Sequence, residues 1–203
     1  PYTGFDATGA ETVTIESSSG NDDIGGTGLR TIRLFGLDEN FVEQTEDIIL
    51  TGTAPVTSQN SYIRLDTAKG LTAGSTGHNE GEITVAQSVS IAVIFAIIPI
   101  TYNTTMIAAY TIPAGKTGYI MSQAGSLSNK QTAAADMRIQ VRGPGEIFTV
   151  GGQIALNSQG TGFIERHFPI PKGIPEKTDF FIEGSATSTI AISAFLEILL
   201  IDN

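Results

Sequence analysis

The sequence predicts an all-β fold, an antiparallel β-sandwich or jelly-roll-like arrangement that forms one large domain or two packed β-domains. Short segments that alternate apolar and polar residues recur along the 203 residues, and none keeps apolar residues at helical spacing for three turns. Gly and Pro close these segments at intervals of roughly 8–15 residues, the spacing of a sandwich or jelly roll. An apolar content of 40% indicates a globular chain with a real core.

The first half begins with alternating strands. The segment Glu11–Glu16 places apolar and polar residues on opposite faces, which predicts a strand with one solvated face. The segment Arg30–Phe35 alternates in the same way, and Leu37–Asn40 supplies turn residues before Phe41–Thr51. The second and third of these strands are therefore predicted to form a hairpin.

Three more strands and a long loop are predicted before residue 99. The strands lie around Ile63 and Leu65, around Ile83 and Val85, and along the apolar run Val89–Ile98. A continuous apolar run predicts a strand that is covered on both faces. The Gly-rich stretch Lys69–Gly81 is predicted to be a loop.

The second half alternates more regularly. Met137, Ile139 and Val141 point to one face, whereas Arg138, Gln140 and Arg142 point to a solvated or partner-facing surface. The last predicted strand, Thr189–Ile201, has an uninterrupted apolar face, which predicts that it runs through the middle of a core. The expected internal boundary is Pro99–Thr105, between an acidic β-domain (residues 1–99) with long Gly/Ser/Thr loops and a jelly-roll-like β-sandwich domain (residues 100–203).

Composition excludes several function classes. A net charge of −10 argues against a nucleic-acid partner, because phosphate binding depends on Lys and Arg. The excess lies in the first half, where residues 1–100 hold thirteen acids against four Lys and Arg. Cysteine is absent, so disulfides and thiolate sites are excluded. The longest apolar run, Ile91–Ile100, is about half the roughly 20 residues that cross a bilayer, so no membrane partner is expected, and no secretion signal is recognised.

Two sequence features resemble catalytic motifs without their full pattern. The segment Ala114–Thr117 resembles the end of a phosphate-binding loop, but Tyr110 stands where that loop needs a Gly. A turn is the favoured interpretation. The chain has two histidines, His78 and His167, and no Gly-x-Ser-x-Gly elbow. Both histidines are predicted to be surface or packing residues.

Paired acids are the remaining candidates for chemistry. The pairs Asp22-Asp23, Asp38-Glu39 and Glu46-Asp47 offer carboxylates for calcium binding or for glycosidic acid/base catalysis. Their spacing matches neither function well, so solvated turns and strand ends are favoured. The sequence therefore predicts no catalytic, cofactor-binding or metal residues, and it leaves open whether Asp22 and Asp23 bind an ion.

Several segments resemble a family of small structural proteins of short-tailed phages, including marine and cyanobacterial ones. The resemblance spans nearly the whole chain and includes no catalytic motif. It rests on Ser17-Ser-Ser-Gly-Asn-Asp, Gly26-Thr-Gly-Leu-Arg-Thr-Ile-Arg-Leu-Phe-Gly-Leu-Asp-Glu-Asn-Phe, Thr51-Gly-Thr-Ala-Pro-Val-Thr, Ser61-Tyr-Ile-Arg-Leu, Tyr110-Thr-Ile-Pro-Ala-Gly-Lys-Thr-Gly-Tyr, Ile139-Gln-Val-Arg-Gly-Pro-Gly-Glu-Ile-Phe, Ile174-Pro-Glu-Lys-Thr-Asp-Phe and Leu200-Ile-Asp-Asn.

The resemblance implies a non-enzymatic virion protein that is assembled in the host cytoplasm. The expected function is that of a capsid decoration or cement protein that stabilises the head lattice. Its expected partners are the major capsid protein or other virion proteins, together with further copies of the chain, as a trimer rather than another oligomer. The alternative is a tail-fibre, spike or head-fibre module that contacts the host surface through its Gly/Ser/Thr-rich loops.

Overall fold

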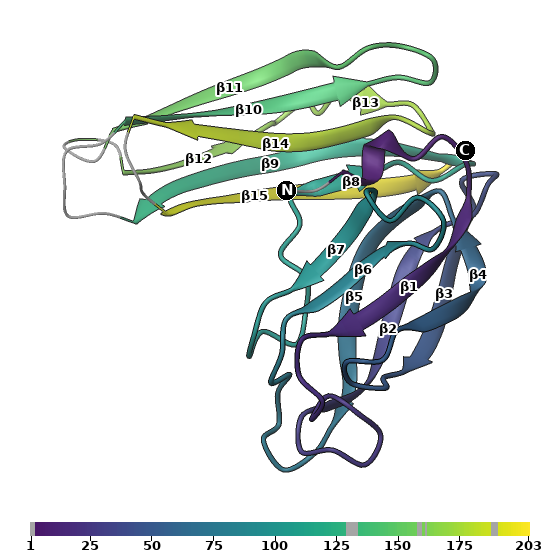
Figure 1. Ribbon diagram of the computed structural model, residues 1–203. Coiled ribbons are helices and arrows are strands. Elements are labelled where there is room, and N and C mark those ends of the chain that lie inside the picture. The colour runs from purple at the N-terminus through teal and green to yellow at the C-terminus, as the bar shows by residue number, and fades with distance from the viewer. Residues whose placement is uncertain (1–2, 129–133, 158–159, 161, 188–190) are drawn as a thin grey trace. The chain divides into compact units, whose positions relative to one another are not determined.

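The computed structural model describes residues 3–128, 134–157, 160, 162–187 and 191–203. Contacts divide the chain into two compact units, Pro1–Ile107 (unit 1) and Ala108–Asn203 (unit 2) (Figure 1). The elements that the structure describes are antiparallel strands and one short 3-10 helix, η1 (Gly4–Asp6). The predicted all-β, antiparallel fold is therefore confirmed.

Unit 1 is a sandwich of two antiparallel sheets. One sheet has the strand order β4-β1-β6-β7 and the other has the order β3-β2-β5. The strands are β1 (Glu11–Ser17), β2 (Leu29–Leu37), β3 (Glu43–Ile49), β4 (Val56–Tyr62), β5 (Arg64–Ala73), β6 (Ile83–Gln87) and β7 (Ile94–Ile98).

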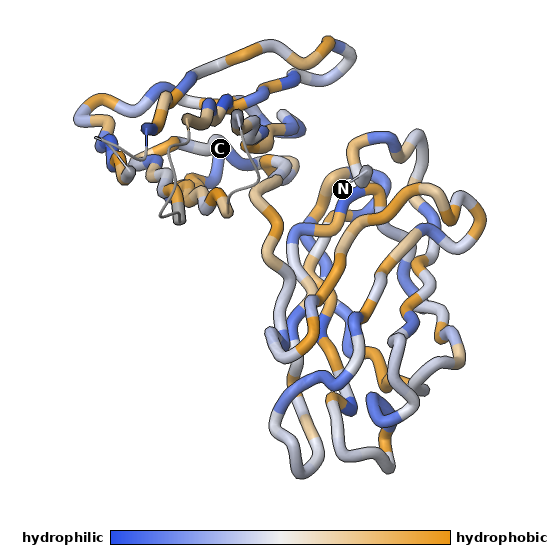
Figure 2. Tube along the Cα trace, turned by 60° about the vertical axis from the view of Figure 1, so that its left-hand side comes forward, coloured by the Kyte–Doolittle hydropathy of each residue, from blue (hydrophilic) through white to orange (hydrophobic). Residues whose placement is uncertain are grey.

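The core of unit 1 forms between the inner faces of its two sheets. Val13, Ile15, Ile32 and Leu34 are fully buried, as their alternating positions predicted. Polar residues occupy most of the other positions of these strands, with Phe35 as an exposed apolar exception, and apolar and polar bands are visible along the chain trace (Figure 2). The predicted hairpin is also confirmed, since β2 pairs with β3 over its length.

Unit 2 is also built from two antiparallel sheets. One has the order β11-β10-β14-β8; in the other, β9 pairs with β12 and β13 along one edge and with β15 along the opposite edge. The strands are β8 (Ala109–Thr111), β9 (Lys116–Ser128), β10 (Ala134–Arg142), β11 (Thr149–Asn157), β12 (Phe163–His167), β13 (Gly173–Ile174), β14 (Asp179–Ala186) and β15 (Ala191–Asp202).

The two sheets of unit 2 pack closely against each other. Met137 and Ile139 are buried, whereas Arg138 is exposed, as the alternation in β10 predicted. A Cβ added at Gly125 of β9 would lie 1.7 Å from Cε of Met137. The absence of a side chain at Gly125 therefore lets β9 approach β10.

Two loop and strand predictions in unit 1 are wrong. The run Val89–Ile98 forms a strand only from Ile94, and Val89 and Ile91 are exposed. The first part of the predicted loop Lys69–Gly81 is instead the end of β5, because this segment pairs with β2 as far as Ala73. In both cases tertiary pairing, which apolarity and Gly content do not encode, decides the local structure.

The last strand lies at a sheet edge rather than in the middle of a core. Strand β15 pairs with β9, and its inward positions, such as Leu196 and Ile198, are half-buried. Thr189 and Ile190, the first residues of the predicted strand, lie outside the described residues. The prediction failed because alternation reveals which face turns inward but not how many strands cover it.

The segment expected to separate two domains belongs to unit 1. Thr101 and Asn103 donate backbone hydrogen bonds to Asn79, and Thr105 donates one to Ala68 of β5. The contacts divide the chain after Ile107 instead.

Candidate functional site

The Asp22 side chain is a buried structural acceptor. Its Oδ1 accepts hydrogen bonds from the backbone N–H groups of Leu29 (2.8 Å) and Glu80 (2.9 Å). Its Oδ2 accepts from the Ser17 hydroxyl (2.6 Å) and from the Gly81 N–H (2.8 Å). Four donors leave the carboxylate little capacity for a cation. They connect the end of β1 to the start of β2 and to the loop at Glu80 and Gly81.

The neighbouring Asp23 has a different role. Its Oδ1 accepts the N–H of Gly25 at 2.8 Å, which closes a local turn. In the part of the chain that the structure describes, no group of three His, Asp or Glu side chains could hold a metal ion. The geometry therefore offers no ion site at Asp22 and Asp23.

Three acids of the other two pairs stabilise strands and turns, and the fourth, Glu39, is exposed. Asp38 accepts the N–H of Asn40 and Val42 within a turn, at 2.8 and 2.9 Å. Asp47 forms a bidentate ion pair with Arg33 across β2 and β3, at 2.6 and 2.8 Å. The Arg33 guanidinium lowers the pKa of the Asp47 carboxyl chiefly through these hydrogen bonds.

Glu46 joins edge strands of the two sheets in unit 1. Its carboxylate accepts the backbone N–H groups of Gln59 (2.7 Å) and Asn60 (3.0 Å) in β4. The Tyr62 hydroxyl also donates to it, at 3.3 Å. Burial, and then the adjacent Glu46 charge, raise the pKa of Tyr62. The contact covers donors of β4 that a second chain could otherwise pair with.

A loop network surrounds Glu80 at one end of unit 1. The Thr27 hydroxyl and the Asn21 amide donate to its carboxylate at 2.5 and 2.8 Å. These hydrogen bonds, that of Thr27 first, lower the pKa of Glu80. Asn79 is fully buried and exchanges hydrogen bonds with Asn103 on the adjacent loop. The Gly/Ser/Thr-rich loops are therefore held by side chains of their own unit.

The two histidines do not assemble a catalytic triad in the described chain. His78 Nδ1 lies 3.2 Å from the carbonyl oxygen of Asn79. His167 Nε2 lies 3.2 Å from the Glu165 carboxylate on an exposed face.

One polar grouping was missed from the sequence, because the registers of β9 with β12 and of β9 with β15 bring its residues together. Ser122 lies directly opposite His167 in that register. Its hydroxyl is 3.0 Å from the Glu197 carboxylate, which accepts the hydrogen bond, while His167 contacts Glu165. A nucleophilic serine needs its base within hydrogen-bond reach, and here the hydroxyl is directed to a carboxylate instead.

The segment Ala114–Thr117 forms a turn, as expected. Gly115 has a φ of +75°, and its N–H donates to the Glu176 carboxylate, so an internal acid occupies the donor that a phosphate would need. Lys116 pairs with Asp202 at 3.1 Å. A strand, β9, follows instead of the helix that a phosphate-binding loop requires.

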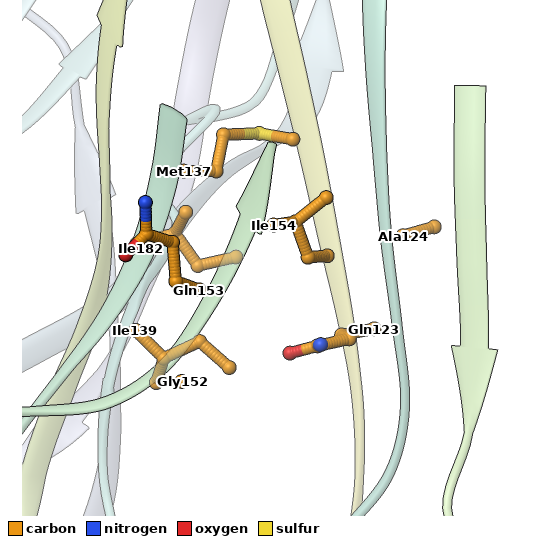
Figure 3. A pocket seen from close by; sticks show the side chains of 8 residues that line it. All are labelled: Gln123, Ala124, Met137, Ile139, Gly152, Gln153, Ile154 and Ile182. Atoms are coloured by element: carbon orange, nitrogen blue, oxygen red, sulfur yellow. The ribbon is translucent and has the colours of Figure 1, made fainter. Parts of the chain in front are cut away.

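The described interior contains a cavity that is too small for an organic ligand. It lies between the sheets of unit 2, where Gln123 and Ile154 extend into the space beside Ile139 (Figure 3). The volume open to a water-sized sphere is about 10 Å³, which is roughly the requirement of one water molecule. It can hold a single bound water.

The outer face of β15 and its neighbours is an exposed apolar surface, defined here as the β15 surface. It comprises Phe163 (60% exposed), Phe195 (58%), Leu199 (48%) and Ile201 (48%). The four residues share a face, because Phe163 lies opposite Ser126 beside Ser193 in the register and side chains alternate along β15. The alternation of β15 in the sequence already placed these residues on the face opposite to the inward row. It did not reveal that this face is exposed.

Comparison with family models, curated proteins and solved structures gives no match for this chain. No helix in the described residues is long and apolar enough to cross a membrane.

Proposed function

We propose that the chain is a structural protein of a phage virion, a capsid decoration or cement protein that stabilises the head lattice. The proposal rests on two observations about its acidic and its exposed apolar side chains. Acids that could do chemistry, such as Asp22 and Glu46, accept hydrogen bonds from their own unit, while the β15 surface exposes large apolar side chains. Such a surface is typical of protein–protein association, and the proposal gives the chain no catalytic role.

The charge distribution supports distinct roles for the two units. Residues 1–107 carry thirteen acids against four Lys and Arg, whereas residues 108–203 carry eight against seven. A strongly acidic surface repels its own copies and attracts a basic partner. We assign the acidic unit 1 to solvent or to a basic neighbour such as the major capsid protein, and we assign association between copies to unit 2.

Counting copies in purified virions tests the proposal. Quantitative mass spectrometry should find this chain at a copy number comparable with that of the major capsid protein, because a decoration protein follows the symmetry of the lattice. A copy number typical of a single tail or vertex structure would support the alternative, a tail-fibre, spike or head-fibre module. Absence of the chain from virions would refute both.

Release of the protein from virions in graded salt tests whether acids of unit 1 contact a basic neighbour. The acids to be changed to Gln are the exposed residues Glu16, Glu39 and Glu82. Asp22 and Glu46 are unsuitable, because neutralising either would disturb the fold itself. If unit 1 meets a basic neighbour, the triple Gln variant should detach at lower salt than the parent. The control is Glu146→Gln, an exposed acid in unit 2. Equal release of all three proteins would place unit 1 toward solvent.

A further inference from the structure

Strand β15 has an open edge. Its twelve residues, Ala191–Asp202, pair with β9 along one side. Within the described chain, no strand pairs with its other side. A row of unpaired backbone N–H and C=O groups is a template for pairing with another strand.

Unit 1 shows how the same chain covers its edges elsewhere. Glu46 covers β4, as described above. Residues 103–105 cover β5, with hydrogen bonds from Gly70 to Asn103 (2.7 Å) and from Thr105 to Ala68 (3.0 Å). Thr3 covers β7, with hydrogen bonds to and from Ile94 at 3.1 and 2.6 Å. Among the described residues, no such contact covers the free edge of β15.

The composition of β15 also lacks the usual protection of an edge. It contains no Pro, Lys or Arg, and the extra residue of its bulge, Met121, belongs to β9. Its outward residues Phe195, Leu199 and Ile201 are exposed. Its inward apolar residues, among them Ile198, are only half-buried. An added strand would thus cover the backbone edge and complete the core beneath it.

We propose that β15 pairs with β15 of a second copy of this chain, antiparallel about a two-fold axis. Length favours this occupant, because β15 has twelve residues, whereas the other edge strands of unit 2 are shorter: β8 has three residues, β11 nine, β12 five and β13 two. An isologous pair covers both open edges at once. The near balance of acids and bases in unit 2, eight against seven in residues 108–203, leaves little repulsion between copies.

The charges of β15 are compatible with this pairing. In an antiparallel pair, residues at equal distances on either side of the axis lie opposite each other. An axis at Ile198 places Glu197 opposite Leu199 of the second copy, and an axis at Leu199 places Glu197 opposite Ile201. Neither register sets two acids face to face, which would be destabilising. The proposed pairing gives a dimer with two-fold symmetry, whereas the resemblance implies a trimer. The pairing does not depend on the proposed function of the protein.

Single-cysteine variants test the pairing directly, because the chain has no native cysteine. Each residue from Phe195 to Ile201 is changed to Cys in turn, and the purified chain is oxidised. The residue nearest a two-fold axis faces its own copy at a Cα separation of about 4.5–5.5 Å, within the roughly 4.4–6.8 Å that a disulfide spans. The yield of disulfide-linked dimer should therefore peak at one position and fall on both sides of it.

Control variants and mass measurements complete the test. Ile147→Cys and Ile170→Cys are exposed at 80% and 91%, away from β15, and should crosslink little. Light scattering should give a dimer for the parent and for Ile147→Glu, and a monomer for Leu199→Glu. A monomeric parent, a trimer without a self-linking position, or a dimer that crosslinks best through Ile147 or Ile170 would overturn the proposal.

Discussion

Replacing Asp22 with Asn is expected to destabilise unit 1 strongly, although the change removes no atom from the side-chain framework. The amide keeps one oxygen, which can still accept the N–H groups of Leu29 and Glu80. Its nitrogen then faces Ser17 and Gly81. The Ser17 hydroxyl can reverse its role and accept a hydrogen bond, but the buried N–H of Gly81 can only donate and loses its acceptor.

The magnitude follows from these contacts. Losing one hydrogen bond to a charged group costs about 1.5–3 kcal/mol, and the two retained N–H bonds weaken by about 1 kcal/mol each when their acceptor becomes neutral. Asn is easier to bury than a carboxylate, which limits the total. The expected loss is roughly 3–5 kcal/mol, a large share of the 5–15 kcal/mol that typically stabilises a domain.

The neighbouring acid provides a matched control. Asp23→Asn keeps the oxygen that accepts the Gly25 N–H, so its stability should stay within about 0.5 kcal/mol of the parent. Urea unfolding gives the free energies, and hydrogen exchange in peptides that cover Leu29 and Gly81 assigns the loss to unit 1. Equal unfolding and equal protection of the two variants would refute the assignment of Asp22 as a buried structural acceptor.

Three further substitutions test other parts of the structure. Ile198→Asp places a charge on the half-buried inner row of β15 and should destabilise unit 2 by a few kcal/mol, measured by urea unfolding, whereas Ile147→Asp, at a position that is 80% exposed and outside β15, should not. Glu46→Gln keeps one acceptor for two N–H donors of β4 and should speed hydrogen exchange there. Alanine at His78 and at His167 should leave the unfolding midpoint nearly unchanged, and a clear decrease would reveal a missed structural contact.

The strands with one solvated face were the most predictable part of the fold. In β1 from Val13 and in β10 from Met137, each apolar residue is followed by a polar one, so the period of two identifies the inward face without knowledge of any partner. Val13 and Met137 are buried for this reason. Such segments carry their structural information locally.

Burial and site chemistry depend on distant residues and could not be predicted in the same way. Asp22 and Asp23 are adjacent and chemically identical, yet one is buried because loop residues Glu80 and Gly81 close over it. The exposure of Val89 was missed for a related reason. Apolarity indicates that a residue avoids water, but it does not say which part of the chain, or which other molecule, covers it.

The difference between being apolar and being covered also explains why the burial of the last strand was predicted incorrectly. The alternation in Thr189–Ile201 identified its inward row, and the structure places this row at a sheet edge, where half of the expected cover is missing. Unit 1 demonstrates that the chain can cover its edges with Glu46, with Thr3 and with residues 103–105. An apolar strand without such cover leaves a folded chain prone to associate. An open edge that meets one defined partner gives specific assembly instead, and β15 of a second copy is the strand of matching length that we propose as this partner.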